Sequence, residues 1–158
     1  MHGNARMRKI AIVLWLVLAG CQSGGGGTAL TAEGATLRLS VFAPATLPEG
    51  GAGAIDVIVG NRGFGAVGNV FVEVELPPEV VVTKEMHGTG VNLIRDARAN
   101  VYHYSINALG VGSDARLHLD VAARFGGAAQ TGPIRVRASE VGIAGDQLER
   151  SAVIRMAQ

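Results

Sequence analysis

The chain of 158 residues has little cysteine and few aromatic residues. Cys21 is its one cysteine, so no disulfide forms within a single chain. Aromatic residues make up 4% of the sequence, and the one tryptophan, Trp15, lies near the N-terminus. These shortages exclude a core built on a disulfide packed against tryptophan. They also leave few aromatic rings on which a sugar would stack.

Sequence signatures of the common catalytic and metal sites are missing as well. No serine stands in a G-x-S-x-G motif, and there is no HExxH, His-x-His or paired cysteine. His87, His103 and His118 are far apart in sequence, and we interpret them as surface histidines. We therefore expect no enzyme activity, no metal site and no cofactor.

Residues 63–68 read Gly-Phe-Gly-Ala-Val-Gly, a literal G-x-G-x-x-G motif. A dinucleotide site needs a helix directly after this motif, whereas residues 70–76 alternate as a strand does. We interpret residues 63–68 as a glycine-rich hairpin loop, with Gly63 at a position of positive φ.

Excess charge of one sign is also missing. The chain has 14 basic and 13 acidic residues, and three of the basic residues, Arg6, Arg8 and Lys9, precede Cys21. The chain from Cys21 onward therefore has 11 basic and 13 acidic residues, a net charge of −2. This balance argues against a general nucleic-acid-binding protein.

The N-terminus resembles a bacterial lipoprotein signal. Three basic residues precede an apolar run over residues 10–18, which is too short to cross a bilayer but fits a signal peptide. Leu18, Ala19, Gly20 and Cys21 follow and resemble a lipobox. The resemblance implies removal of residues 1–20, lipidation of Cys21 and anchoring in a lipid bilayer of the cell envelope. Gln22, in place of Asp, favours the outer membrane if the organism is Gram-negative.

Glycine and valine dominate what remains. Residues 21–34 include four consecutive glycines, and we expect a lipidated cysteine followed by a flexible tether. Residues 35–158 should fold as one domain, since short alternating apolar segments recur between Gly- and Pro-bearing breaks. Val72 and Val74 should face the core, and Glu73 and Glu75 should face water. The alternating segments lie near residues 37–41, 55–59, 70–76, 80–83, 102–106, 117–123, 134–138 and 152–156.

Seven or eight such strands predict an all-β, antiparallel sandwich. Three segments also resemble the bacterial conserved-repeat domain (domain of unknown function eleven), across residues 36–157. They are Leu-Pro-Glu-Gly at 47–50 before a strand ending in Asn-Arg-Gly at 61–63, the strand closing in Leu76-Pro77, and Leu-Gly-Val-Gly at 109–112 before a further strand. Val111 departs from the usual proline. The resemblance implies an immunoglobulin-like fold and specifies no function.

Two surface features suggest contacts with a partner. Arg135 and Arg137 share the outward face of one strand, and Arg155 faces outward on the last strand, so a hairpin would align them. Phe64 lies in the glycine-rich loop. Phe42 and Phe71 fall at strand positions whose side chains should face outward. We expect a structural or protein-interaction module whose partner is an envelope protein. The alternative is a module that binds a glycan or an anionic surface, through the arginines or the loop around Phe64, and an enzyme is a distant third.

Overall fold

The computed structural model describes residues 27–94, 100–124, 129–141 and 147–157. These residues form eleven strands, and none of them is helical, which confirms the all-β prediction. The strands are β1 (Gly27–Glu33), β2 (Leu37–Pro44), β3 (Thr46–Pro48), β4 (Ala52–Asn61), β5 (Val67–Glu75), β6 (Val80–His87), β7 (Val91–Ile94), β8 (Val101–Leu109), β9 (Asp114–Ala123), β10 (Gln130–Glu140) and β11 (Gln147–Ala157).

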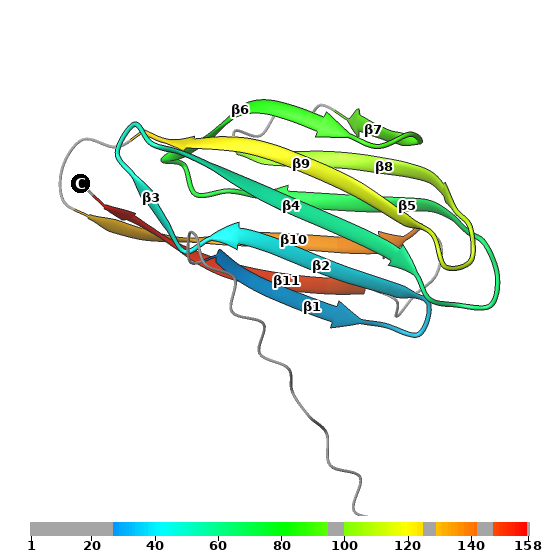
Figure 1. The fold of residues 1–158 in the computed structure, drawn as a ribbon. Helices are drawn as coiled ribbons and strands as arrows, with labels where there is room; N and C mark the ends of the chain where they lie inside the picture. The colour runs from blue at the N-terminus through cyan, green and yellow to red at the C-terminus, as the bar shows by residue number, and fades with distance from the viewer. Residues whose placement is uncertain (1–26, 95–99, 125–128, 142–146, 158) are drawn as a thin grey trace, which may run out of the picture.

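The strands form two sheets packed face to face (Figure 1). Sheet A has the order β1-β2-β4-β9-β6, and sheet B has the order β3-β11-β10-β5-β8-β7. Neighbouring strands are antiparallel except β3 and β11, which are parallel. Strands β6 and β7 are the edge strands on one flank of the sandwich.

The core lies between the sheets and follows the period-two pattern of the sequence. Val72 and Val74 on β5 are buried, whereas Glu73 and Glu75 are half-buried on the outer face, so the expected register is confirmed. The same alternation buries Leu119 on β9. Each fully buried valine or leucine contributes roughly 1.5–3 kcal/mol to stability.

The tether expected over residues 21–34 is shorter than the sequence suggested, because its second half belongs to the folded domain. Residues 27–33 form β1, which pairs with β2 from Gly27 opposite Pro44 to Glu33 opposite Arg38. Ala32 is buried in the core and Leu30 packs against it. The folded domain therefore includes residues from Gly27, and residues 21–26 lie outside the described residues.

The glycine-rich loop is not a hairpin, because it joins β4 in sheet A to β5 in sheet B. A strand follows it, as the sequence predicted. Gly63 does not have a positive φ, so that expectation was wrong. A Cβ on Gly63 would lie 2.8 Å from Cγ2 of Thr36, so glycine is needed for close approach.

Candidate interaction surfaces

The outer face of sheet B carries a chain of charged side chains across four strands. The guanidinium of Arg137 on β10 lies 2.7 Å from the Glu73 carboxylate on β5 and 2.9 Å from the Glu149 carboxylate on β11. Glu73 also lies 2.9 Å from Nε2 of His103 on β8. We call these four residues the Arg137 ladder. Its positive and negative charges pair with one another within the sheet. The electrostatic attraction that this face offers to an outside ligand is therefore reduced.

The pKa values follow from this arrangement. Burial alone would raise the pKa of Glu73, but hydrogen bonds from His103 and Arg137 outweigh burial and hold that pKa below its ordinary value. The carboxylates of Glu149 and Glu73 raise the pKa of Arg137. Glu73 is therefore ionised at neutral pH and helps to join the strands.

The three arginines expected to form a stripe lie on neighbouring strands. β10 and β11 form the antiparallel pair that the sequence suggested. Arg135 pairs with Glu75 at 3.2 Å and lies opposite Ser151, whereas Arg155 lies opposite Thr131. Arg155 is exposed and has no ion-pair partner among the described residues. Two of the three charges are thus matched by carboxylates, and docking on this stripe stays a prediction.

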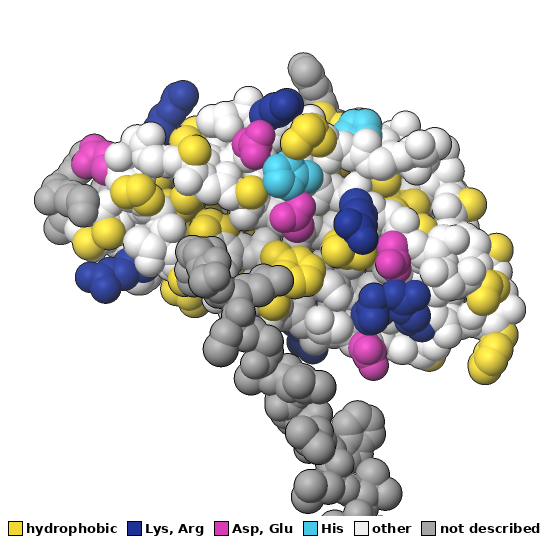
Figure 2. Space-filling model, viewed as in Figure 1, with side chains coloured by type: hydrophobic (Ala, Val, Ile, Leu, Met, Phe, Trp, Pro, Cys, Tyr) yellow, Lys and Arg dark blue, Asp and Glu magenta, His cyan; other side chains and the backbone are white. Residues whose placement is uncertain are grey.

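The outer face of sheet A is built differently. Phe42 on β2, Asp56 on β4, His118 on β9 and Met86 on β6 lie opposite one another in a single row across the sheet. We call these four residues the sheet A row. Phe42 and Met86 are 43% and 44% exposed, which is high for large apolar side chains. Figure 2 shows apolar, acidic, basic and histidine side chains side by side on one face of the molecule.

His118 lies between two carboxylates. Its Nδ1 is 2.7 Å from Oδ1 of Asp56, and its Nε2 is 3.1 Å from Oδ1 of Asp120. The hydrogen bond with Asp56 raises the pKa of His118 above its ordinary value, and Asp120 adds to this effect although burial opposes it. Acidification therefore changes the charge in the centre of this face.

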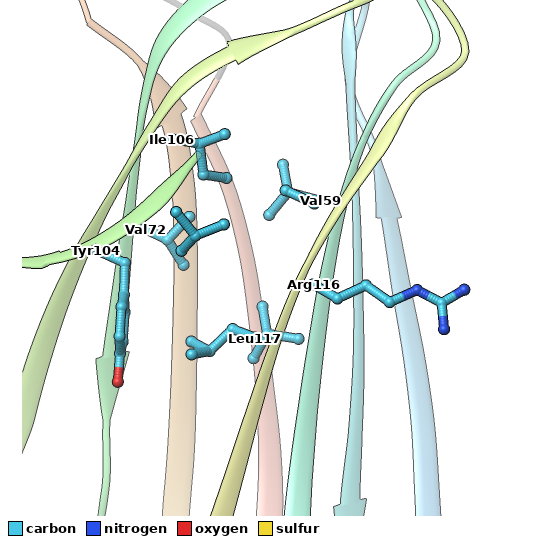
Figure 3. A pocket seen from close by; sticks show the side chains of 9 residues that line it. Val59, Val72, Tyr104, Ile106, Arg116 and Leu117 are labelled. Carbon is cyan, nitrogen blue, oxygen red and sulfur yellow. The ribbon is translucent and has the colours of Figure 1, made fainter. Parts of the chain in front are cut away.

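Unmatched positive charge flanks the sheet A row. Arg38 on β2 and Arg116 on β9 lie beside β4, and neither has an ion-pair partner in the described part of the chain. Figure 3 shows the Arg116 side chain extending away from the interior of the sandwich. Arg62 pairs with Asp114 at 3.0 Å. The sequence alternation placed Arg116 and His118 outward but gave no sign of which charges would find partners.

The aromatic residues do not form one patch. Phe42 lies on the outer face of sheet A, whereas Phe71 lies on the outer face of sheet B, with its ring centroid 4.9 Å from that of His103. Phe64 is fully exposed in the loop between β4 and β5. Asn61 holds the base of that loop. Its Nδ2 donates to the carbonyl oxygens of Gly65 and Leu109 at 2.7 and 2.9 Å, and its Oδ1 accepts from the Gly63 N–H at 2.9 Å.

The interior of the sandwich holds one small space near the flank of β6 and β7. Val59, Val72, Ile106 and Leu117 line it (Figure 3), and its volume is about 10 Å³. A space of this size holds about one water molecule, so it is no substrate site.

Within the described residues no group of three or more His, Cys, Asp or Glu side chains is arranged to hold a metal ion. His103 lies on sheet B, whereas His87 and His118 lie on sheet A. The described part of the chain also contains no helix long and apolar enough to cross a membrane. Leu18, Ala19, Gly20 and Cys21 lie outside the described residues, so the lipobox stays a prediction.

No protein-family model matches the chain, and no curated protein matches its sequence. Solved structures do match. The third ScaC cohesin of Acetivibrio cellulolyticus, in complex with the ScaB dockerin, has 9% identity and a TM-score of 0.52, covering 72% of this chain and 95% of the cohesin. The Bacillus cereus major pilin subunit BcpA has 9% identity and a TM-score of 0.53, covering 72% of this chain and 37% of the pilin. A CARDB domain from Pyrococcus furiosus has 16% identity and a TM-score of 0.49, covering 82% of this chain and 95% of that domain.

The two sheets and the likenesses to the cohesin and the pilin subunit establish the fold, an immunoglobulin-like β-sandwich, as the sequence predicted. The resemblance to the conserved-repeat domain receives no support from the family models and is confirmed only in this fold. The class of protein that the fold defines is an immunoglobulin-like β-sandwich module.

Proposed function

We propose that the protein is a lipid-anchored, non-catalytic module of the cell envelope, and that it binds a partner protein through the outer face of sheet A. The observation that carries the proposal is the sheet A row, in which exposed Phe42 and Met86 flank Asp56 and His118. Apolar side chains beside charged ones are typical of the centre and rim of a protein interface.

The two outer faces offer a direct comparison. In sheet B the Arg137 ladder and the pair of Arg135 with Glu75 satisfy their charges within the sheet, and Arg155 on β11 is the exception among the described residues. In sheet A, Arg38 and Arg116 have no ion-pair partner among the described residues, and large apolar side chains are exposed beside them. A partner that covers sheet A would bury apolar surface and supply carboxylates for these arginines. The likeness to a cohesin solved with its dockerin supports an interaction role at the level of the fold.

Cross-linking from defined positions tests the docking face. A photo-reactive amino acid is placed at Phe42 or, as the matched control, at Val153, which is 61% exposed on β11 of sheet B. We expect the full-length protein in its own membrane to give one defined cross-linked product from position 42 and none from 153. Met86→Asp should remove that product, because it places a charge in the same row. Identical products from both positions, or none from position 42, would refute docking on sheet A.

The anchoring part of the proposal rests on the lipobox, with Cys21 as the acylated residue. Two or three acyl chains on one residue hold a protein on a bilayer, because each buried methylene contributes about 0.8 kcal/mol. Wild-type protein should partition into the detergent phase and start at Cys21 with added acyl mass. Cys21→Ala should remain unprocessed or be released. A mature protein that starts elsewhere and carries no acyl mass would contradict the anchor.

A further inference from the structure

Strand β6 changes which of its side chains face the core partway along its length. Val80 and Val82 lie opposite Ala123 and Val121 of β9, on the core side. A β-bulge between Val82 and Lys84 then adds one residue. Without the bulge, Lys84 would be the next side chain on the core side. With the bulge, that position belongs to Glu85, which lies opposite the buried Leu119. Bulges of this kind re-aim side chains, and here the result is a carboxylate turned toward the space between the sheets.

Tyr104 on β8 lies close to this carboxylate. Its side chain is fully buried, and its hydroxyl has no hydrogen-bond partner in the described structure. Burial raises the pKa of Tyr104 strongly, and the Glu85 carboxylate, which lies close enough to act as a hydrogen-bond acceptor, raises it further. A buried hydroxyl without a partner is unfavourable, because it has given up its hydrogen bonds to water. Tyr104 and Glu85 therefore place a buried hydroxyl donor and a carboxylate acceptor close together.

An open depression of about 300 Å³ lies beside these groups, between β6 and β7. Val82 and Leu93 supply apolar walls, Thr83 and Lys84 the rim, and Glu85 the acidic group. Tyr104 does not itself line the depression, but Leu93 is the β7 residue opposite it, so the tyrosine lies directly behind this wall. Both flanking strands are edge strands, and an edge strand offers unpaired N–H and C=O groups to an incoming chain.

We propose that this depression is a second binding site, separate from the outer face of sheet A, and that it receives a lysine side chain from an extended segment of a partner protein. The aliphatic stem packs on Val82 and Leu93, and the ammonium group donates hydrogen bonds to the Glu85 carboxylate, which in turn accepts from the Tyr104 hydroxyl. A carboxylate has two oxygens, so it accepts from both donors. The ammonium group of Lys84 does not itself occupy the depression, because Lys84 lies opposite Asp120 and its side chain is on the outer face of sheet A.

Tyrosine NMR provides a direct readout, since the chain has only two tyrosines. The full-length protein in detergent micelles carries ¹³C at the tyrosine ζ carbons, and Tyr102→Phe assigns the two signals. The probe is n-butylamine, with 1-butanol as the uncharged control of the same stem. We expect n-butylamine to shift the Tyr104 signal until the change saturates. The uncharged 1-butanol should need at least a tenfold higher concentration to produce the same shift. Equal responses to the two probes, or no response to n-butylamine, would overturn the site.

Two variants and a peptide sharpen the test. Glu85→Gln should weaken n-butylamine binding at least tenfold, whereas Glu79→Gln, a change of the same kind just before β6, should not. A blocked Thr-Val-Lys-Val-Thr peptide should bind more tightly than n-butylamine and than its norleucine counterpart. Unchanged binding in Glu85→Gln would exclude the carboxylate as the recognition group. A lysine peptide no better than the free amine would exclude the extended segment. None of these outcomes depends on docking at Phe42, so this site and the proposed function fail separately.

Discussion

Arg137 and Glu73 lie opposite each other on neighbouring strands of sheet B, with Nη1 of the arginine 2.7 Å from Oε1 of the glutamate. From alternation alone, Glu73 is a solvent-facing residue that tolerates substitution. In the structure it also contacts His103, so it links β5 to the strands on both sides. The glutamates of this face are therefore part of what holds sheet B together.

Glu73→Gln should lower the free energy of unfolding by about 1 kcal/mol, because two charge-assisted hydrogen bonds weaken at a half-buried position. Glu79→Gln, which breaks no side-chain hydrogen bond or ion pair of the described structure, should change it by less than about 0.5 kcal/mol. Urea melts of the two variants make the comparison. The depressed pKa of Glu73 adds a second signature: its contribution is present above the ordinary value of 4.5 and is lost as the pH falls through the lower folded-state pKa. Equal melts for both variants would show that the Arg137 ladder adds nothing.

His118 should make stability fall as the pH rises above 6.5. Because Asp56 raises the folded-state pKa of His118 above its ordinary 6.5, the extra stability is fully present below pH 6.5 and is lost as the pH rises through the raised pKa. Asp56→Asn should flatten this part of the profile. Thermal melts between pH 5.5 and 8.5, together with the imidazole NMR titration of His118, measure it. An ordinary imidazole titration in the wild-type protein would rule out the effect.

Gly63→Ala should destabilise the fold by about 1–3 kcal/mol, because the new methyl group would lie 2.8 Å from Cγ2 of Thr36. Gly65→Ala in the same loop should be close to neutral, since nothing lies within 4 Å of its Cβ position. Thr36→Ser removes the obstructing methyl group and should rescue Gly63→Ala in a double-mutant cycle. If the two glycine variants melt alike, close approach to Thr36 is not the reason for Gly63.

Asn61→Asp should be severely destabilising. The asparagine amide donates to two carbonyl groups, and a carboxylate in its place would face both oxygens without a proton to share. A buried and unpartnered charge costs several kcal/mol, so a loss of about 3 kcal/mol or more is expected. Asn107→Asp, at an exposed position on β8, is the matched control. Denaturant melts that differ by less than about 1 kcal/mol would mean that Asn61 is replaceable.

The sequence predicted most of the architecture because alternation survives in most of the long strands, β6 being the exception. Residues 70–76 show a clear period of two, and the structure places their valines inside. Strands β3 and β7 have three and four residues, too few for a period to be visible. Strand β1 was missed because its small and polar residues resemble a linker, and pairing with β2 gives it its conformation.

The candidate sites were harder to predict, for two physical reasons. Charge matching joins residues far apart in sequence, such as Glu73 with Arg137, and alternation does not specify which strands become neighbours. The bulge after Val82 shifts the parity of β6, so a strict period of two would place Lys84 and Met86 inside. The structure instead exposes Met86 and turns Glu85 inward, and both proposed surfaces depend on that shift.

Under the proposed anchoring at Cys21, the early start of β1 would limit how far the domain reaches from a bilayer. Gly27, its first residue, follows Cys21 by six residues, and six residues span at most about 20 Å even when fully extended. With Cys21 acylated, the sandwich is held in a thin layer beside the headgroups. An encounter with another membrane-bound protein then becomes a search in two dimensions at a raised effective concentration. Weak contacts, too weak to hold two freely diffusing proteins together, suffice under that constraint, whereas a partner deeper in the envelope has to extend toward the membrane to be reached.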